Sequence, residues 1–329
     1  MAPRHYLGLA IAAVFLAYPW LLASPFYERM GALVLLSAIS ASAWNLLGGY
    51  AGQASVGHAV FFGAGAYLPL LLFTRLGLPP VAGVPVGIAA SVVIALVIGF
   101  PTFRLSGHYF TMATVAVAEL VRLVVSNWDL LGAAVGLSGP AVPRGWWDLS
   151  FRSSVPYYYI FLGVLAVVLL STWQMQRSRM GFYLRAIKAG DRAARSLGVP
   201  VRRYKLYALM LSAAFTSVAG SLYAMMVGFI DPDSGLGILV SVEMLIIAAL
   251  GGAGTLFGPL LGALILIPLQ NATNSWLGGT GSGASYVIYG AIIMALARYQ
   301  PGGLMNAWYG LQERRRRRAR PPVEAPRAA

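Results

Sequence analysis

The sequence contains no cysteine, and only 10% of its 329 residues are charged. The absence of cysteine excludes a disulfide framework, a thiolate metal site and a cysteine nucleophile. An ordinary soluble domain is about one quarter charged, whereas this chain is 58% hydrophobic with a mean hydropathy of +0.71. The composition therefore excludes an ordinary soluble domain and indicates a membrane protein.

Residue patterns for catalysis are also missing. The chain has two lysines, Lys188 and Lys205, and neither stands in the glycine-rich pattern of a phosphate-binding P-loop. Its three histidines, at positions 5, 58 and 108, lack metal-ligand spacing, and there is no H-E-x-x-H motif or Ser-His-Asp arrangement. We expect no catalytic residue, metal site or cofactor in this chain, so ATP and Mg²⁺ would be bound by partner subunits.

Long apolar runs occupy most of the chain, and a membrane helix needs about 20 such residues to cross about 30 Å of hydrocarbon. Their continuity favours helices over the alternating strands of a membrane barrel. Glycines and Pro259 interrupt the later, shorter runs, which predicts discontinuous helices there. The sequence predicts an all-α polytopic bundle with about ten crossings, the first of them retained rather than cleaved as a signal. The runs cover residues 7–23, 31–47, 56–73, 81–103, 109–125, 157–173, 206–227, 238–250, 260–269 and 287–297.

The distribution of positive charge predicts the orientation of these crossings. With the basic segment 174–205 in the cytoplasm, 19 of the 24 Lys and Arg residues lie inside, four lie outside and Arg122 lies within a span. Both termini are then cytoplasmic. We assign residues 1–303 to a membrane domain and 304–329 to a basic, disordered tail, whose Arg314 to Arg318 run indicates a topology anchor near anionic lipid rather than nucleic-acid binding.

Trp146, Trp147 and the adjacent tyrosines Tyr157, Tyr158 and Tyr159 are predicted to form an aromatic belt at the outer membrane interface. Tryptophan and tyrosine concentrate there because their rings are apolar at one end and polar at the other.

The basic segment 174–205 contains an amphipathic helical pattern over residues 181–196, followed by Gly198 and Pro200. The stretch from Ala193 to Gly198 resembles the A-A-x-x-x-G loop by which permeases of ATP-binding cassette (ABC) importers contact their ATPase subunits, although Arg192 replaces the usual acidic first residue. A basic helix lying on lipid is the alternative interpretation. The coupling candidates that the resemblance implies are Arg185, Asp191, Arg192, Ala193, Ala194, Leu197 and Gly198.

Further motifs indicate which family of permeases the chain resembles. Residues 45–59, NLLGGYAGQASVGHA, and 250–263, LGGAGTLFGPLLGA, closely resemble two signatures of the branched-chain amino acid ABC permeases. Residues 104–122 are similar to the LivM-like member of the paired permeases. The resemblance covers about residues 31–300 and carries three motifs in the expected order.

The resemblance implies a permease subunit of a binding-protein-dependent importer for branched-chain or other hydrophobic amino acids, in a bacterial inner membrane. The implied partners are a second homologous permease, two cytoplasmic ATP-binding subunits, an extracytoplasmic binding protein and membrane lipid, with no nucleic acid. Urea or short amides are an alternative cargo for the same machinery. An ion-coupled secondary carrier is a different class, which would require paired acidic residues in mid-membrane.

Glycines and ionisable residues supply the candidates for the substrate pathway. Glycines allow a helix to unwind and expose main-chain groups, or simply to pack tightly. Ionisable groups within a membrane either serve a function or pair with one another. Glu119 and Arg122 lie three positions apart on one helix and could neutralise each other. Glu243 could bind a substrate ammonium group or cap a neighbouring helix. His58 could donate a hydrogen bond within the bundle. The pathway candidates are Gly52, Gln53, Ser55, Gly57, His58, Glu119 and Glu243.

Overall fold

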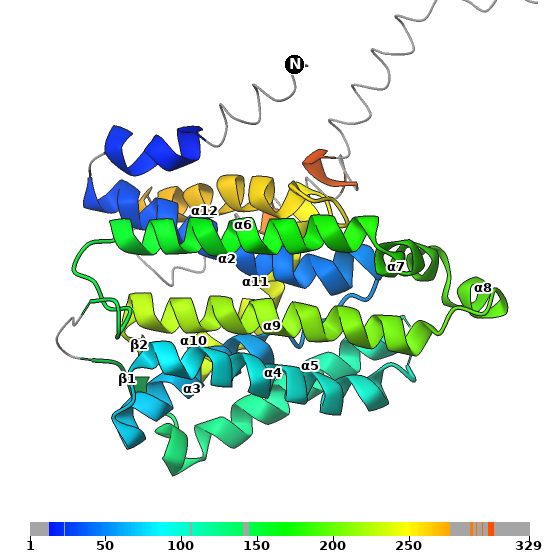
Figure 1. Cartoon of the computed structure of the whole chain (residues 1–329), viewed down its shortest axis with the longest axis horizontal. Helices are drawn as coiled ribbons and strands as arrows, with labels where there is room; N and C mark the ends of the chain where they lie inside the picture. Colours follow the sequence, from blue (N-terminus) through cyan, green and yellow to red (C-terminus); the bar gives the residue numbers. More distant parts are fainter. Residues whose placement is uncertain are drawn as a thin grey trace, which may run out of the picture.

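The computed structural model describes residues 13–22, 24–105, 107–140 and 145–276, with a few positions between 290 and 305. Most long helices run along a common axis, and two short strands, β1 (Leu137–Ser138) and β2 (Phe229–Ile230), pair antiparallel at one end (Figure 1). The helices are α2 (Pro25–Asn45), η1 (Leu46–Tyr50), α3 (Ala59–Leu76), α4 (Pro80–Thr102), α5 (His108–Ser126), η2 (Asp129–Leu131), α6 (Val155–Arg177), α7 (Arg179–Ala189), α8 (Asp191–Ser196), α9 (Val201–Val227), α10 (Pro232–Leu236), α11 (Ile238–Gly251) and α12 (Gly258–Trp276).

Seven helical segments in the described part of the chain are long and apolar enough to cross a membrane. Each coincides with a predicted apolar run, so the all-α polytopic prediction is confirmed. The predicted run 260–269 lies within α12. The run 7–23 is only partly among the described residues, and most of the run 287–297 and of the 304–329 tail lies outside them. The count of ten crossings stays a prediction. The seven segments are Pro25–Tyr50, Ala59–Leu76, Pro80–Thr102, His108–Ser126, Val155–Arg177, Val201–Val227 and Pro232–Gly251.

The predicted helix interruption near Gly251 is confirmed. Helix α11 ends there, Gly252 and Gly254 have positive φ values of 126° and 85°, and α12 begins at Gly258. A second interruption follows α2, which continues into the π-helix η1 before residues 51–58 leave the helical conformation. Positive φ favours glycine because a Cβ would be strained there.

Helices α3 and α9 pack so closely that their backbones touch. A Cβ on Gly65 of α3 would collide with the main chain of Ser217, and one on Gly220 of α9 would collide with the main chain of Phe62. The Ser221 hydroxyl donates to the Gly65 carbonyl oxygen at 2.7 Å. Small residues that allow close backbone approach are the usual means of helix association in membranes, where lipid removes the hydrophobic driving force.

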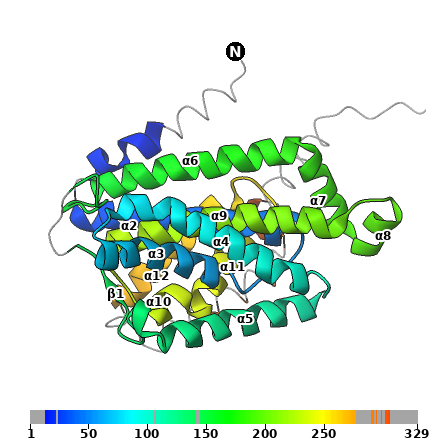
Figure 2. The same cartoon turned by 60° about the horizontal axis from the view of Figure 1, so that its bottom comes forward.

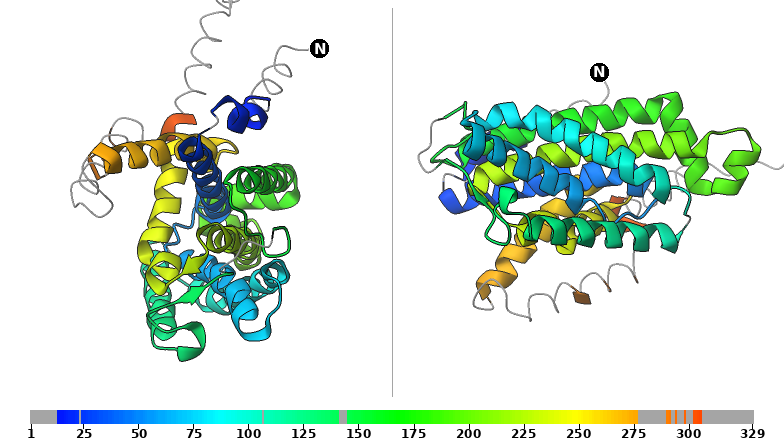
Figure 3. Two further views of the ribbon diagram at one scale, coloured as in Figure 1. Left: turned by 90° about the vertical axis from the view of Figure 1, so that its left-hand side faces the viewer. Right: turned by 90° about the horizontal axis from the view of Figure 1, so that it is seen from below.

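Helix α9 also connects two buried clusters. The second half of α9 belongs to one cluster, with residues of α2, α3, α6, α11 and α12. Its first half belongs to the other, with η1, α7, α8 and single residues of α3, α4, α5 and α6. The end-on view shows α9 between α6 and the α3–α4 pair (Figure 3).

The prediction that the three tyrosines belong to an interfacial belt is wrong for two of them. Tyr157 and Tyr158 are buried in the protein, and their hydroxyls donate to the carbonyl oxygens of Met225 at 3.1 Å and Phe15 at 2.7 Å. Both rings therefore face protein rather than lipid headgroups. Trp146 and Trp147 are exposed, as a belt requires.

Replacing Gly220 by valine is expected to lower stability by about 1–3 kcal/mol or more, because the new side chain must push α9 away from α3. Gly163→Val on α6 is the matched control, since no atom lies within 4 Å of a Cβ built there. Thermal unfolding in detergent should give a lower Tm for Gly220→Val alone. Equal Tm values would show that this contact does not hold the bundle.

Candidate functional site

The two helix interruptions meet inside the protein, joined by the buried Asn45 at the end of α2. Its Nδ2 donates to the Thr255 carbonyl oxygen at 2.9 Å, and its Oδ1 accepts from the Gly254 amide at 2.7 Å. One side chain therefore satisfies both a donor and an acceptor of the segment 252–257. Non-helical backbone at membrane depth is tolerated only when such internal partners exist.

The segment 51–58 is held in the same way by its neighbours. The Trp44 indole donates to the Ser55 carbonyl oxygen at 2.7 Å. Thr114 of α5 accepts from the Val56 amide at 3.1 Å, and Ser241 of α11 accepts from the Ala59 amide at 2.7 Å. Groups from three helices thus replace the lost intrahelical bonds.

His58 is fully buried at the start of α3, 2.9 Å from its Nε2 to the Ser212 hydroxyl oxygen. Ser212 itself donates to the Ala43 carbonyl oxygen at 2.6 Å. Because that hydroxyl has a single proton, His58 Nε2 must be the donor to Ser212. This arrangement supports the structural interpretation of His58, as a hydrogen-bond donor within the bundle.

The predicted pairing of Glu119 and Arg122 is present, with Nη2 and Oε1 2.6 Å apart. Arg122 also reaches Asp233 of α10 at 2.7 Å, so it connects α5 to α10 across 111 positions of sequence. Glu119 is therefore neutralised by a neighbouring cation rather than available in mid-membrane.

The remaining glycine-motif candidates surround the first interruption. Gly52 is exposed with a φ of 68°, and the Gln53 amide approaches the Ala51 carbonyl oxygen at 3.5 Å. The Ser55 hydroxyl accepts from the Gly57 amide at 3.3 Å. The structure places these residues in a supported turn next to α5 and away from the larger cavity described next.

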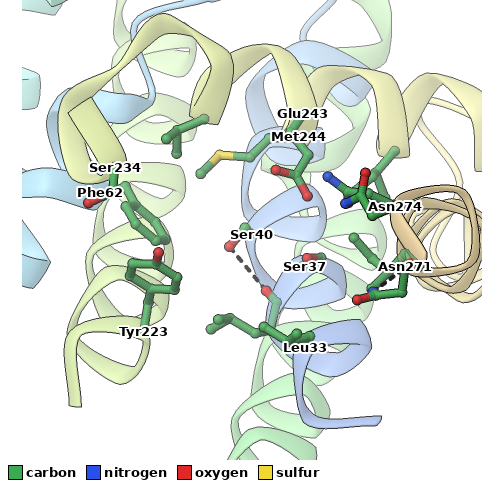
Figure 4. A pocket seen from close by; sticks show the side chains of 15 residues that line it. Leu33, Ser37, Ser40, Phe62, Tyr223, Ser234, Glu243, Met244, Asn271 and Asn274 are labelled. Atoms are coloured by element: carbon green, nitrogen blue, oxygen red, sulfur yellow. Dashed lines mark hydrogen bonds between the residues drawn. The ribbon is translucent and has the colours of Figure 1, made fainter. Parts of the chain in front are cut away.

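A cavity of about 470 Å³ lies between α2, α11 and α12, with α3, α9 and α10 at its edge (Figure 4). Of the seven pathway candidates, only Glu243 is among the described residues that line it, and its carboxylate points from α11 into the cavity. One part of the lining is polar and the other apolar. The polar part is Ser37, Ser40, Tyr223, Ser234, Glu243, Gln270, Asn271 and Asn274, and the apolar part is Leu33, Leu36, Phe62, Val240, Met244, Ile247 and Ile267.

Helices α7 and α8 project beyond the bundle at the end opposite the two strands (Figure 2). Asp191 of α8 forms an ion pair with the buried Lys205 of α9, and Ala194 is buried against the same end of the bundle. Leu197 is 81% exposed, and Gly198 has a φ of 78°. The other three coupling candidates, Arg185, Arg192 and Ala193, are also exposed. The projecting pair α7–α8 therefore has some residues bound to the bundle and others exposed on its surface.

Lys188 on α7 was not among the predicted coupling residues, yet it touches both interruptions. A Cβ on Gly52 would approach its Cγ at 3.1 Å, and one on Gly254 would approach its Nζ at 2.9 Å. Both lysines of this arginine-rich chain thus lie where α7 and α8 meet the bundle. Lysine is so rare in this sequence that its two positions could have been singled out as candidates.

Other functional residues were also absent from the sequence-based candidates. Asn45, Ser241 and Thr114 support the interruptions, and the amides of Gln270 and Asn274 line the cavity. Their signal was polarity inside otherwise apolar runs, because polar groups in membranes are costly unless they are partnered or used.

A multi-pass helical bundle with two supported interruptions, an amphipathic cavity between its helices and a projecting helical pair is the architecture of a membrane transport protein. Residues 27–297 match the family described as "Branched-chain amino acid transport system / permease component". The chain belongs to this family.

Similar proteins include permeases with different named substrates. The high-affinity branched-chain amino acid transport system permease protein LivM of Escherichia coli K12 is 28% identical, over 90% of this chain and 74% of the relative. The ribose import permease protein RbsC of the same strain is 25% identical, over 64% of this chain and 66% of the relative. The autoinducer 2 import system permease protein LsrC of Klebsiella pneumoniae is 34% identical, over 42% of this chain and 44% of the relative.

Asn45→Ala is expected to loosen the segment 252–257, because it leaves the Gly254 amide and the Thr255 carbonyl without their partner. Each unsatisfied buried group costs about 1–3 kcal/mol. Hydrogen exchange followed by mass spectrometry should show roughly tenfold faster exchange in this segment. Asn127→Ala is the control, since within the described residues the Asn127 side chain bonds only to its own helix, at an exposed end. Unchanged exchange in Asn45→Ala would refute the bridging role.

Proposed function

We propose that this chain is the permease subunit of a binding-protein-dependent ABC importer for branched-chain or other hydrophobic amino acids, in a bacterial inner membrane. The observation that carries the choice of cargo is the cavity, which combines a carboxylate and amides with an apolar wall. The similarity to LivM over 90% of the chain supports the same choice.

In this proposal α7 and α8 face the cytoplasm and receive the movement of an ATP-binding subunit. The exposed Leu197 offers an apolar contact, while the Asp191–Lys205 ion pair and Lys188 connect the projection to α9 and to both interruptions. The interruption at 252–257 leads directly into α12, which lines the cavity. A displacement of α7 would thus shift cavity walls, as alternating access requires.

Sugar import is the second candidate function, because the ribose permease matches 64% of the chain. Urea or short amides remain a further cargo for the same machinery, and neither they nor a sugar would need a carboxylate in the cavity. A secondary carrier has less support, since Arg122 already neutralises Glu119.

Mild-detergent affinity purification from the native membrane tests the assembly. We expect a second permease and P-loop subunits to co-purify with ATPase activity, and the complex in vesicles to import leucine when ATP and a binding protein are supplied. Uptake of ribose but not leucine would show that the substrate is a sugar rather than an amino acid. A chain purified alone, with gradient-driven uptake and no ATPase, would refute the importer.

Leu197→Glu is expected to uncouple ATP hydrolysis from transport. Burying a leucine contributes about 1.5–3 kcal/mol, so losing that contact should lower uptake roughly tenfold or more. Because Leu197 is exposed in this chain, the protein itself should stay folded. Leu76→Glu, at an exposed site at the end of α3, is the control and should import leucine normally. Normal uptake by Leu197→Glu would remove α8 from the coupling contact.

A further inference from the structure

The charge of the cavity is unbalanced. Glu243 is the one acidic residue in the described lining, and that lining contains no lysine, arginine or histidine. Within the part of the chain that the structure describes, the Glu243 carboxylate makes no hydrogen bond or ion pair with another residue. An acidic residue in a membrane span is costly without a partner. A cationic group on a ligand would supply that partner.

The polar groups around Glu243 differ in their availability. Ser40 donates to the Leu36 carbonyl oxygen at 3.0 Å, and Asn271 donates to the Ile267 carbonyl oxygen at 2.9 Å, so both serve their own helices. In contrast, the described contacts leave the side chains of Ser37, Gln270 and Asn274 without a protein partner. Hydroxyl and amide groups can donate to a carboxylate. The cavity therefore offers donors for an anion beside an acceptor for a cation.

The apolar part of the lining offers a surface for an apolar side chain of the ligand. Leu36, Met244 and Ile247 expose aliphatic surface in the same space, and Met244 lies one position after Glu243 on α11. The volume lies within the roughly 300–1,000 Å³ that is usual for small-molecule sites. A hydrated sugar, with hydroxyls on every side, would leave polar groups unpaired against this wall.

We propose that Glu243 binds the ammonium group of an amino acid whose carboxylate meets Ser37, Gln270 and Asn274 and whose apolar side chain lies against Leu36, Met244 and Ile247. This assignment rests on the proposed transport function and names the site through which the cargo passes. It makes the ammonium group, rather than the carboxylate, the feature that the permease itself selects.

The absence of native cysteine allows a direct test in the assembled transporter. Val240→Cys places a single thiol in the cavity at a lining residue to which the proposal assigns no ligand group, and Thr74→Cys places one at an exposed site at the end of α3 as a control. The rate of thiol modification is measured with leucine, leucinamide, 2-hydroxy-4-methylpentanoate or ribose present and no binding protein. Leucinamide keeps the ammonium group, and the hydroxy acid lacks it.

We expect leucine and leucinamide to protect Val240→Cys, the hydroxy acid to protect it far less, and none to protect Thr74→Cys. Adding Glu243→Gln should weaken protection by leucine roughly thirtyfold, as expected when one partner of a desolvated charge pair is lost. It should also lower the ratio of modification rates by cationic and anionic methanethiosulfonates by about tenfold, because the negative charge has gone.

Equal protection by leucine and the hydroxy acid, unchanged by Glu243→Gln, would overturn the assignment. Protection by ribose instead of leucine would overturn it as well. If leucine protects through Glu243 but uptake in vesicles proceeds without ATPase subunits, the binding site is supported and the importer function fails. The two failures are therefore distinguishable.

Discussion

Backbone groups that leave a helix inside hydrocarbon must find new partners within the protein, and the architecture of this chain depends on that requirement. The segments 51–58 and 252–257 lie about 200 positions apart in the sequence. Nevertheless, a side chain from the helix before the first segment holds the second, and a side chain from the helix before the second segment supports the end of the first. Asn45 satisfies Gly254 and Thr255, while Ser241 of α11 satisfies the start of α3. The two interruptions therefore stabilise each other, and neither could be kept alone at low cost.

This mutual support explains why polar residues gather on the inner faces of α2, α5 and α11. The same interruptions leave room for Lys188 of α7 to lie against Gly52 and Gly254, where any Cβ would intrude. Small residues also pack α3 closely against α9, where Gly65 meets the main chain of Ser217 and Gly220 meets that of Phe62. The cavity lies away from the break itself, between residues 240–247 of α11 and 267–274 of α12.

The sequence predicted what local patterns encode. Apolar runs located the seven described spans, glycines located the break at Gly251, and three-residue spacing predicted the Glu119–Arg122 pair. It could not predict that Asn45 bonds to residues 210 positions away, because no periodicity encodes that contact. The tyrosines at 157 and 158 matched an interfacial composition, but their burial depends on tertiary neighbours. The cavity, likewise, exists only where six helices meet.

Helix α9 is 27 residues long, which corresponds to about 40 Å. Near its first turn Lys205 is paired with Asp191 of the projecting α8, and near its last turn Tyr223 lines the cavity. Its tight contact with α3 lies between these points. A tilt of α9 about its contact with α3, by about 5° over its ~40 Å length, would displace one end of the helix relative to the other by about 3.5 Å, slightly more than the width of a water molecule.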